Sequence, residues 1–393
     1  MADRDVVIVG AGPVGLGAAL AVHRAGRVPT VIEAGAADRI RPGSRAIFLH
    51  NVTLQLFERI QPGLGHELAR HGLAWTTRRT LYRGRDVYRR TYPSTVIDGL
   101  PAATSLPQVV TERILLDACI AAGIEFIWNT PVAGVRADES GARVDGEQGP
   151  IASAEYVVGA DGARSIVRDS TGLRLEGPRT SNAFVIVDVA EDPEQPLPLE
   201  RVFHYEHPAA GFRNVLFVPF AGHWRVDLQC REGDDPDEFS SDAGVARWLS
   251  RVMPAKYADR VTWVSTYVFR QAVADRFADS SARVLLAGEA GHVFAPFGAR
   301  GLNSGVADAW VAARAIADGR VAQFGESRRA AAIRNRAASS IALAHMTAHT
   351  PMELARRRIA GTLAPFVTSI GRWMDRAPYG PSLGPPDQDG MQY

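Results

Sequence analysis

Two short glycine-rich segments, about 280 residues apart, constrain the fold of this chain more than any other feature. The first contains Gly10, Gly12 and Gly15 and follows a continuous apolar run at residues 5–9. The second, residues 288–303, follows another apolar run. Runs of this kind are typical of strands that are buried on both faces. The chain is therefore expected to contain a parallel sheet whose strands lead through tight turns into helices.

The first segment indicates a dinucleotide site. Gly10 permits a tight turn, Gly12 lets the backbone approach a pyrophosphate, and Gly15 lets the following helix pack closely on the strand. A second strand, residues 29–32, ends in Glu33, where the ribose hydroxyls would be bound. The carboxylate would repel a 2′-phosphate, which favours FAD or NAD over NADP. The predicted contacts are Gly10, Gly12, Pro13, Val14, Gly15, Glu33 and Ala34. A glycine turn without a ligand is the alternative, and the complete strand, turn, helix, strand and acid series argues against it.

Two later segments repeat the strand–turn–helix design. An apolar run leads into Asp161 and Gly162, and Arg168 follows at the start of a helix, a placement suited to phosphate or ribose contacts. Glu289 stands at the carboxyl end of the strand at 283–287, where a ligand is expected. A helix is predicted from Gly301 to Gly319, and its N-terminus would favour the anionic edge of a reduced isoalloxazine.

On these motifs, residues 1 to about 320 resemble the single-component FAD-dependent aromatic hydroxylases, typified by p-hydroxybenzoate hydroxylase and 3-(3-hydroxyphenyl)propionate hydroxylase. The resemblance adds Arg45, beside the FAD, and Gln108, near the ribityl chain. Around the flavin it places Asp161, Gly162, Arg168, Glu289, Pro296, Gly298, Gly301, Leu302 and Asn303.

The fold that the resemblance implies is α/β. A Rossmann-like FAD-binding domain of the glutathione reductase type would carry an inserted antiparallel-sheet substrate domain and C-terminal helices. We expect residues 1–75, 95–175 and 275–345 in the FAD-binding domain and residues 76–94 and 176–274 in the substrate-binding domain. Residues 346–393 would form the C-terminal helices and tail.

The chain departs from the family pattern at three places. The acid of the third motif is Glu289 where the family usually has aspartate, and the usual Pro-Pro pair reads Ala295-Pro296. Arg300 replaces the glutamine of the usual Gly-Gln-Gly. Two interpretations of Arg300 are open: a positive charge at the flavin edge, or a surface salt bridge.

The resemblance implies a monooxygenase that takes electrons from NADPH or NADH as a transient donor. With O2 it would hydroxylate a phenolic or heteroaromatic small molecule through a flavin C4a-hydroperoxide. The candidate catalytic residues are Pro296, Arg300, His204, Arg225 and Tyr267. An FAD-dependent epoxidase or oxidase is the alternative, and a flavin-free binding protein of the same fold is a third interpretation.

The middle of the chain has short alternating runs, at residues 184–189, 202–205, 215–220, 224–228 and 263–269, which predict an antiparallel sheet. Six arginines crowd between Arg78 and Arg90. A hairpin that turns at Gly84 accounts for them better than a nucleic-acid patch does.

Composition excludes several classes of protein. The two cysteines, Cys119 and Cys230, lie too far apart in the sequence for the CxxC pair of a flavin disulfide reductase. Two histidine pairs, 204 with 207 and 345 with 349, lack a third ligand, so no metal site is predicted. The net charge of +1 indicates no nucleic-acid partner.

No apolar run is long enough to span a membrane, and the chain enters a strand at once, so a cytoplasmic location is expected. The resemblance leaves a homodimer open. Helices are predicted from 326 to 376, with breaks at Pro351 and Pro365, and the tail after Ala377 is expected to be loose.

Overall fold

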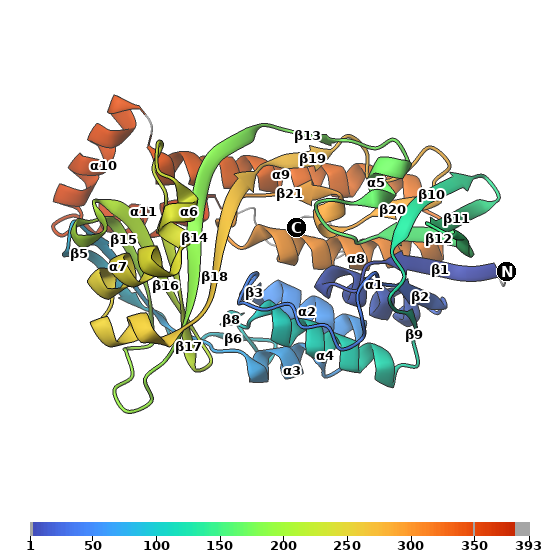
Figure 1. The fold of residues 1–393 in the computed structure, drawn as a ribbon, viewed down its shortest axis with the longest axis horizontal. Helices are drawn as coiled ribbons and strands as arrows, with labels where there is room; N and C mark the ends of the chain where they lie inside the picture. Colours follow the sequence, from blue (N-terminus) through green and yellow to red (C-terminus); the bar gives the residue numbers. More distant parts are fainter. Residues whose placement is uncertain (1–2, 349, 382–393) are drawn as a thin grey trace.

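The first of two large sheets forms one end of the molecule (Figure 1). The computed structural model describes residues 3–348 and 350–381. The strand order of this first sheet is β10 (Val132–Asp138), β11 (Gly141–Gly146), β12 (Gly149–Gly159), β1 (Asp3–Val9), β2 (Pro29–Ile32) and β9 (Glu125–Ile127), and β20 (Val284–Leu286) pairs with β12. Strands β20, β12, β1, β2 and β9 run parallel, so their carboxyl ends lie along one edge, here called the carboxyl edge.

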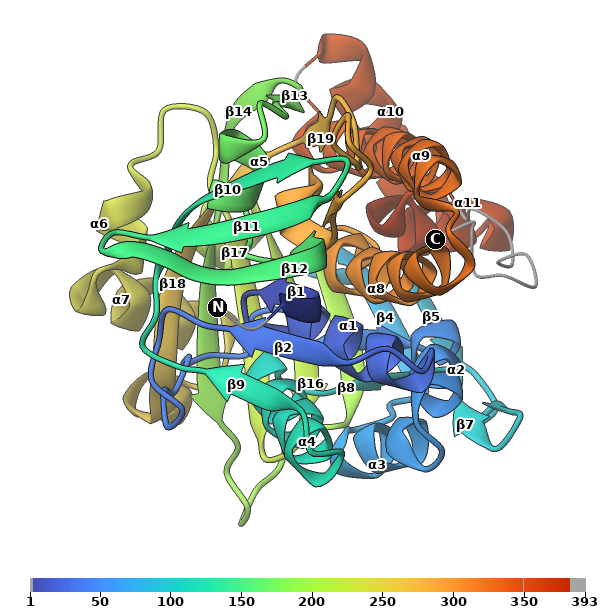
Figure 2. The same cartoon turned by 90° about the vertical axis from the view of Figure 1, so that its right-hand side faces the viewer.

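Helices cover this sheet because its central strand is apolar on both faces. Val6, Val7 and Ile8 of β1 are fully buried, as the continuous apolar run predicts. Helix α1 (Pro13–Arg24) packs against α4 (Gln108–Ala121) and α8 (Arg300–Asp318). Figure 2 looks onto this end of the molecule, where α2 (Asn51–Ile60) and α3 (Leu64–His71) lie near α4.

The second large sheet lies at the opposite end of the long axis (Figure 1). Its order is β18 (Val261–Arg270), β14 (Arg179–Ala190), β17 (His223–Gln229), β16 (Arg213–Phe220), β15 (Glu200–His207), β4 (Thr77–Tyr82) and β5 (Arg85–Thr91). The predicted hairpin is present as β4 and β5, with a left-handed Gly84 in the turn. The five predicted strands are all present, and β15 pairs with β4 in parallel.

The two faces of the second sheet have different neighbours. Val185, Val187 and Val226 join a core with α7 (Asp242–Val252), and we call this the outer face. Phe184, Ile186 and Phe203 alternate with them and form a core with Phe297, near the start of α8, and with the C-terminal helices. This inner face is therefore directed toward the part of the chain that contains the second glycine-rich segment.

Three small strands and the C-terminal helices join the two ends. β13 (Leu175–Glu176), β19 (Ala272–Ala274) and β21 (His292–Val293) form a sheet of their own. The long α9 (Val321–Thr347) crosses between the two ends of the molecule (Figure 1), and α10 (Pro351–Leu363), α11 (Thr368–Arg376) and the short η4 (Ala377–Tyr379) follow. Pro351 starts α10 within a capping box formed by Thr350 and Glu353.

The structure confirms the predicted α/β architecture with an antiparallel-rich second sheet and C-terminal helices. The domain boundaries remain a prediction. The expected loose tail after Ala377 is wrong for residues 378–381: Pro378 and Tyr379 lie in η4, and the carbonyls of Tyr379 and Pro381 accept hydrogen bonds from Arg300. The rest of that tail, residues 382–393, lies outside the described residues.

Close packing of α1 on β1 gives a test of the fold. A Cβ added at Gly15 would lie 1.9 Å from the Gly10 carbonyl oxygen, whereas one added at Gly17 would meet only Phe57, at 3.5 Å. We expect Gly15→Ala to lower the free energy of unfolding by about 1–3 kcal/mol. Gly17→Ala, in the same helix, should be neutral or stabilising by about 0.5–1 kcal/mol. Urea denaturation measures both, and equal stabilities would contradict the packing.

Candidate functional site

The first glycine segment forms the turn at the carboxyl end of β1. Gly10 has φ +100°, and a Cβ there would lie 2.6 Å from the Ala160 carbonyl oxygen, so only glycine fits. At Gly12 an added Cβ would meet a single atom within 4 Å, Nη1 of Arg41 at 3.4 Å. The protein itself therefore does not require glycine at position 12. A group bound close to the backbone there would require it, and the predicted pyrophosphate is such a group.

Glu33 lies at the carboxyl end of β2 and is buried. Its carboxylate accepts hydrogen bonds from the backbone N–H of Ala11 (2.7 Å) and of Gly35 (3.0 Å), and Arg39 and Arg41 approach it to 3.5 Å and 3.4 Å. Burial alone would raise the pKa of Glu33, but the two N–H groups and the arginines together lower it. Glu33 is thus a carboxylate that fixes the Gly10–Gly12 turn and the segment with Ala34 in position.

The second segment is packed directly against the first. A Cβ at Gly288 or at Gly305 would lie within 3.0 Å or 2.6 Å of the Val14 side chain. Val14 follows Pro13, which occupies the first turn of α1. Two glycines on one side and Val14 on the other therefore bring the turn η3 (Gly288–Ala290), α8 and α1 together at the carboxyl edge.

The Asp161–Gly162 element lies between these segments. Asp161 accepts hydrogen bonds from Ser165 Oγ (2.5 Å) and the Val167 N–H (3.1 Å), at the start of α5 (Ile166–Ser170). Burial raises the pKa of Asp161 despite these bonds. The Arg168 guanidinium donates to the carbonyls of Ala163 and Ala290, both at 3.2 Å. Arg168 therefore joins this element to η3, whereas its predicted contact with phosphate or ribose remains a prediction.

Asp308 of α8 is a completely buried carboxylate that sequence reasoning missed. It accepts hydrogen bonds from the Gly288 N–H (3.0 Å) and from Arg328 Nε (2.6 Å), and it lies 2.8 Å from His292 Nε2. Burial alone would raise the pKa of Asp308, but Arg328 and His292 lower it. Because all three partners come from different elements, Asp308 fixes the turn that carries Glu289.

Glu289 is open to solvent, yet protein surrounds it closely enough to affect its pKa. The side chain is exposed, yet burial by surrounding protein raises its pKa, against the effects of His292 and Arg45. Tyr267 of β18 is half-buried, and burial and the nearby Glu289 raise its pKa. Exposed groups that are desolvated are enclosed by protein on most sides, as expected of residues that line a binding site. Glu289, Tyr267 and Arg45 thus come from η3, the second sheet and the loop after β2.

The loop of Gly43, Ser44 and Arg45 rests on one row of the inner face. In the second sheet, Trp263, Asp188 and Arg225 are cross-strand neighbours on β18, β14 and β17. A Cβ at Gly43 would collide with the Trp263 ring at 2.3 Å, the Ser44 N–H donates to Asp188 (2.6 Å), and Arg225 donates to the Arg45 carbonyl. Asp188 and Trp263 were missed because the strand register is not visible in the sequence.

Arg225 lies in this row. It is buried and forms a two-pronged ion pair with Asp227, at 2.7 Å and 3.0 Å. It also donates to the loop backbone at Arg45, so these contacts favour a positioning role, and its predicted catalytic role remains a prediction. Gln108, at the start of α4, lies in the same region, where its side chain accepts from the Ala46 N–H (3.4 Å) and donates to Glu112 (2.7 Å).

His204 does not belong to this site. It alternates with Phe203 and Tyr205, whose side chains lie in the inner core, and it therefore points to the opposite face. Its Nε2 accepts a hydrogen bond from the Gly84 N–H (2.9 Å), and burial lowers its pKa to about 3. This placement at the β4–β5 turn, away from the inner face, does not favour the predicted catalytic role of His204.

The loop before α8 is held by its own hydrogen bonds. Gly298 and Ala299 both have left-handed backbone angles, φ +79° and +53°, and the Ala299 N–H donates to the Pro296 carbonyl (3.1 Å). Buried Asn303 accepts from the His50 N–H (3.0 Å) and Thr53, and it donates to the Phe48 and Ala299 carbonyls (2.9 and 2.6 Å). The Asn303 side chain therefore fixes α8 and its loop, next to Leu302, which is buried.

Gly301 and Arg300 differ in their surroundings. A Cβ at Gly301 would meet nothing within 4 Å, so the protein leaves space there. The Arg300 guanidinium donates to Asn335 of α9 and to the carbonyls of Tyr379 and Pro381. These partners belong to the C-terminal part of the chain, and the two interpretations of Arg300 from the sequence remain predictions beside these contacts.

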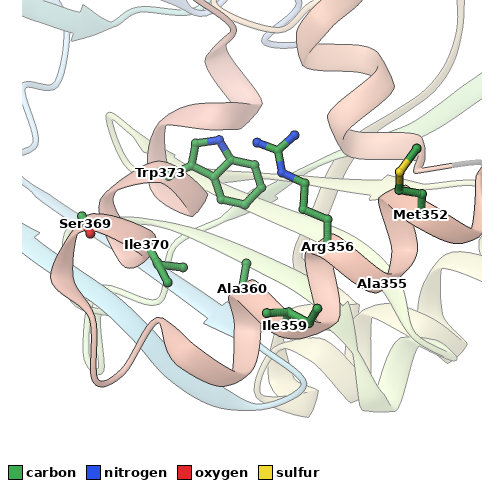
Figure 3. A pocket seen from close by; sticks show the side chains of 8 residues that line it. All are labelled: Met352, Ala355, Arg356, Ile359, Ala360, Ser369, Ile370 and Trp373. Carbon is green, nitrogen blue, oxygen red and sulfur yellow. The ribbon is translucent and has the colours of Figure 1, made fainter.

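An apolar groove of about 500 Å³ lies between α10 and α11, away from the motifs (Figure 3). Met352, Ile359, Ile370 and Trp373 line it, and the Arg356 guanidinium lies 4.5 Å from the centre of the Trp373 ring. It contains none of the predicted site residues, so we do not assign the chemistry to it. Among the described residues, no three His, Cys, Asp or Glu side chains are grouped as a metal ion would require.

Replacing the buried carboxylate tests the network around η3. Asp308→Asn keeps the shape but leaves buried Arg328 without this carboxylate, and we expect a loss of about 3–5 kcal/mol in the free energy of unfolding at neutral pH. The control, exposed Asp318→Asn on the same helix, should change stability by less than about 0.5 kcal/mol.

The pH dependence of the same variant has a defined sign. Since the pKa of Asp308 is lowered in the folded protein, its contribution is complete above the unfolded pKa of about 4 and falls as the pH drops through the folded value. The stability difference between wild type and Asp308→Asn should therefore shrink in acid. A difference independent of pH would contradict an ionised Asp308.

Comparison with known proteins agrees with this geometry. A family model described as an FAD binding domain matches residues 3–340. The chain is 33% identical to 6-methylpretetramide 4-monooxygenase of Streptomyces rimosus, covering 80% of this chain and 56% of the relative. It is 30% identical to a 3-(3-hydroxy-phenyl)propionate/3-hydroxycinnamic acid hydroxylase of Mycobacterium avium (strain 104), covering 78% and 53%. The chain thus spans about half the length of these curated relatives.

Solved structures share the fold. The p-nitrophenol 4-monooxygenase of Pseudomonas putida superposes with a TM-score of 0.78 at 24% identity, covering 96% of this chain and 98% of that one. Anhydrotetracycline hydroxylase from Streptomyces rimosus gives 0.68 at 26% identity, covering 96% and 76%. With the family model matching most of its length, the chain belongs to the FAD binding domain family.

Proposed function

We propose that this protein is an FAD-dependent monooxygenase that uses NAD(P)H and O2 to hydroxylate a phenolic or heteroaromatic small molecule. One observation carries the proposal: the three motif segments meet at the carboxyl edge of the first sheet, and Tyr267 of the second sheet approaches Glu289 there. In open α/β sheets, ligands bind at this edge. The monooxygenases and hydroxylases among its relatives support the reaction class.

The residues fit an FAD in an extended arrangement. Gly10, Gly12 and the start of α1 would hold the pyrophosphate, and Glu33 would receive the ribose hydroxyls at the adenosine end. Arg45, Gln108 and Glu289 would bind the ribityl side, while Pro296, Gly298 and Gly301 would border the ring. The space at Gly12 and Gly301 supports this placement, because no protein atom requires glycine at either position.

Bound FAD would supply the redox chemistry, accepting a hydride from NAD(P)H and activating O2 by the C4a-hydroperoxide route of the hydroxylases. The chain's own residues would bind and orient the substrate. Tyr267 keeps its proton at neutral pH, as an ordinary tyrosine does, and burial raises its pKa further. Its hydroxyl could therefore donate a hydrogen bond to a phenolic or carboxylate oxygen. The inner face would exclude water through Phe184, Ile186 and Phe297.

In this proposal the domain division of the sequence analysis also holds, with the flavin on residues 1–75, 95–175 and 275–345 and the substrate on residues 76–94 and 176–274. NADPH or NADH would bind transiently. In the part of the chain that the structure describes, no helix is long and apolar enough to cross a membrane.

Flavin binding can be tested at Gly12. Because its φ of −76° suits alanine and only Arg41 lies near an added Cβ, Gly12→Ala should change the stability of the flavin-free protein by less than about 1 kcal/mol. The methyl group would meet the pyrophosphate, and FAD affinity should fall by at least about tenfold. Fluorescence titration of the flavin-free protein measures both forms. Wild-type protein that takes up no FAD would contradict the cofactor assignment.

The reaction class can be tested with a panel of phenolic and heteroaromatic acids. A monooxygenase should oxidise NADH or NADPH faster when its substrate is present and should form a product one oxygen atom heavier, in proportion to the NAD(P)H consumed. Mass spectrometry and a peroxide assay measure the two outcomes. Stoichiometric peroxide without hydroxylated product would identify an oxidase instead.

A further inference from the structure

Arg300 is the first residue of α8 and directly follows the left-handed pair Gly298 and Ala299. Its guanidinium donates to Asn335 Oδ1 (3.2 Å), to the Tyr379 carbonyl (3.1 Å) and to the Pro381 carbonyl (2.8 Å). A planar guanidinium presents donors in a fixed fork and can hold several acceptors at once. The glutamine that is usual at this position has one NH2 group and a shorter reach, so it cannot reproduce all three bonds.

The backbone of the loop also touches the C-terminal chain. A Cβ at Gly298 would lie 2.7 Å from the Tyr379 carbonyl oxygen, so glycine allows the two backbones to approach. A non-glycine residue in the left-handed region, Ala299, persists where its surroundings hold it. Arg300 provides such a restraint at the next residue along the chain.

Residues 375–381, here called the C-terminal segment, are themselves anchored on the second sheet. Buried Asp375 lies 3.5 Å from both Arg78 of β4 and Arg201 of β15. The same two guanidinium groups lie 5.2 Å and 4.7 Å from the centre of the Tyr379 ring. The segment therefore connects β4 and β15 of the second sheet to the loop before α8.

We propose that Arg300 is a positioning residue that ties the flavin-ring loop, residues 296–301, to the C-terminal segment, so that this segment sets the loop's conformation. The proposal rests on the proposed function only in assigning the loop to the flavin ring. The contacts between this loop and the C-terminal segment are present in the chain without flavin. On this account the Arg300 guanidinium holds three protein oxygens, and the glutamine-to-arginine departure from the family pattern accompanies the contact of this loop with the C-terminal segment.

The first test measures the link in flavin-free protein by hydrogen–deuterium exchange of peptides covering 296–301 and 375–381. Arg300→Gln should speed exchange in both peptides, because both lose the hydrogen bonds that the Arg300 guanidinium makes between them. Arg300→Lys, which can reach one or two acceptors, should give an intermediate effect. The matched control is Arg336→Gln on α9, whose side chain also donates to a backbone carbonyl, that of Glu176 at 3.0 Å. The control should leave both peptides unchanged.

The second test works from the other end of the link. Tyr379→Leu removes the ring between Arg78 and Arg201 while keeping the backbone carbonyl, and it should speed exchange at 296–301 although no loop residue has changed. FAD affinity should fall about tenfold in Arg300→Gln and in Tyr379→Leu. In the double variant, FAD affinity should fall by much less than the product of the two single-variant factors, because both substitutions break the same link.

The outcomes separate this inference from the proposed function. Wild-type exchange at 296–301 in both single variants would overturn the link, even if flavin binds normally. Independent, multiplicative losses of FAD affinity would also overturn it. Faster exchange in the variants together with a wild type that binds no FAD would confirm the link and contradict the cofactor assignment. If Arg300→Gln fails to fold, Arg300→Lys and Tyr379→Leu decide the matter.

Discussion

The buried carboxylate of Asp308 is the interaction on which the arrangement of the site depends. Burying a charge away from water costs free energy unless hydrogen-bond and ion-pair partners surround it. The elements that carry these partners are therefore fixed relative to one another. The Gly288 N–H, His292 and Arg328 meet at this one side chain. Val14 then fills the space that Gly288 and Gly305 leave open. The position of Glu289, next to Gly288, follows from these two constraints, one electrostatic and one steric.

Local constraints were predictable from the sequence and distant ones were not. Gly15 and Glu33 act on residues of their own strand–turn–helix unit, so the spacing of this segment predicts the turn and the central strands correctly. The Ala160 carbonyl that restricts Gly10 comes from the end of β12 and was not predicted. The partners of Asp308 and Asp188 come from elsewhere: Asp188 bonds to Ser44, 144 residues away. The alternation of apolar and polar residues along a strand predicts which side chains share a face, but it does not predict which face is the inner one. For this reason the sequence predicts His204, Arg225 and Tyr267 alike as catalytic candidates, whereas in the structure His204 lies on the face opposite to Tyr267.

Arg300 shows why a matching motif position does not fix the direction of a side chain. The family pattern places the residue next to the flavin, and that position is compatible with the start of α8. The direction of the side chain, however, is set by its hydrogen-bond acceptors, which are three oxygen atoms of α9 and the C-terminal segment. Composition of the tail, rich in proline and glycine, suggested a loose end. Buried Asp375 and the stacked Tyr379 give the start of that tail a defined position instead.

The second sheet is connected to loops at the carboxyl edge of the first sheet at two separate places. Trp263, Asp188 and Arg225 hold Gly43, Ser44 and Arg45 on the first, and the C-terminal segment holds residues 296–301 on the second. The first contact is to the backbone of residues 43–45. The second is made by the Arg300 side chain, which donates to the Tyr379 and Pro381 carbonyls, and by the close approach of the Gly298 backbone to Tyr379. If the second sheet shifts, Arg45 and the loop before α8 are therefore expected to move with it. In the proposed function, a substrate that packs on the inner face would act on the flavin site through these two loops, as well as by direct contact.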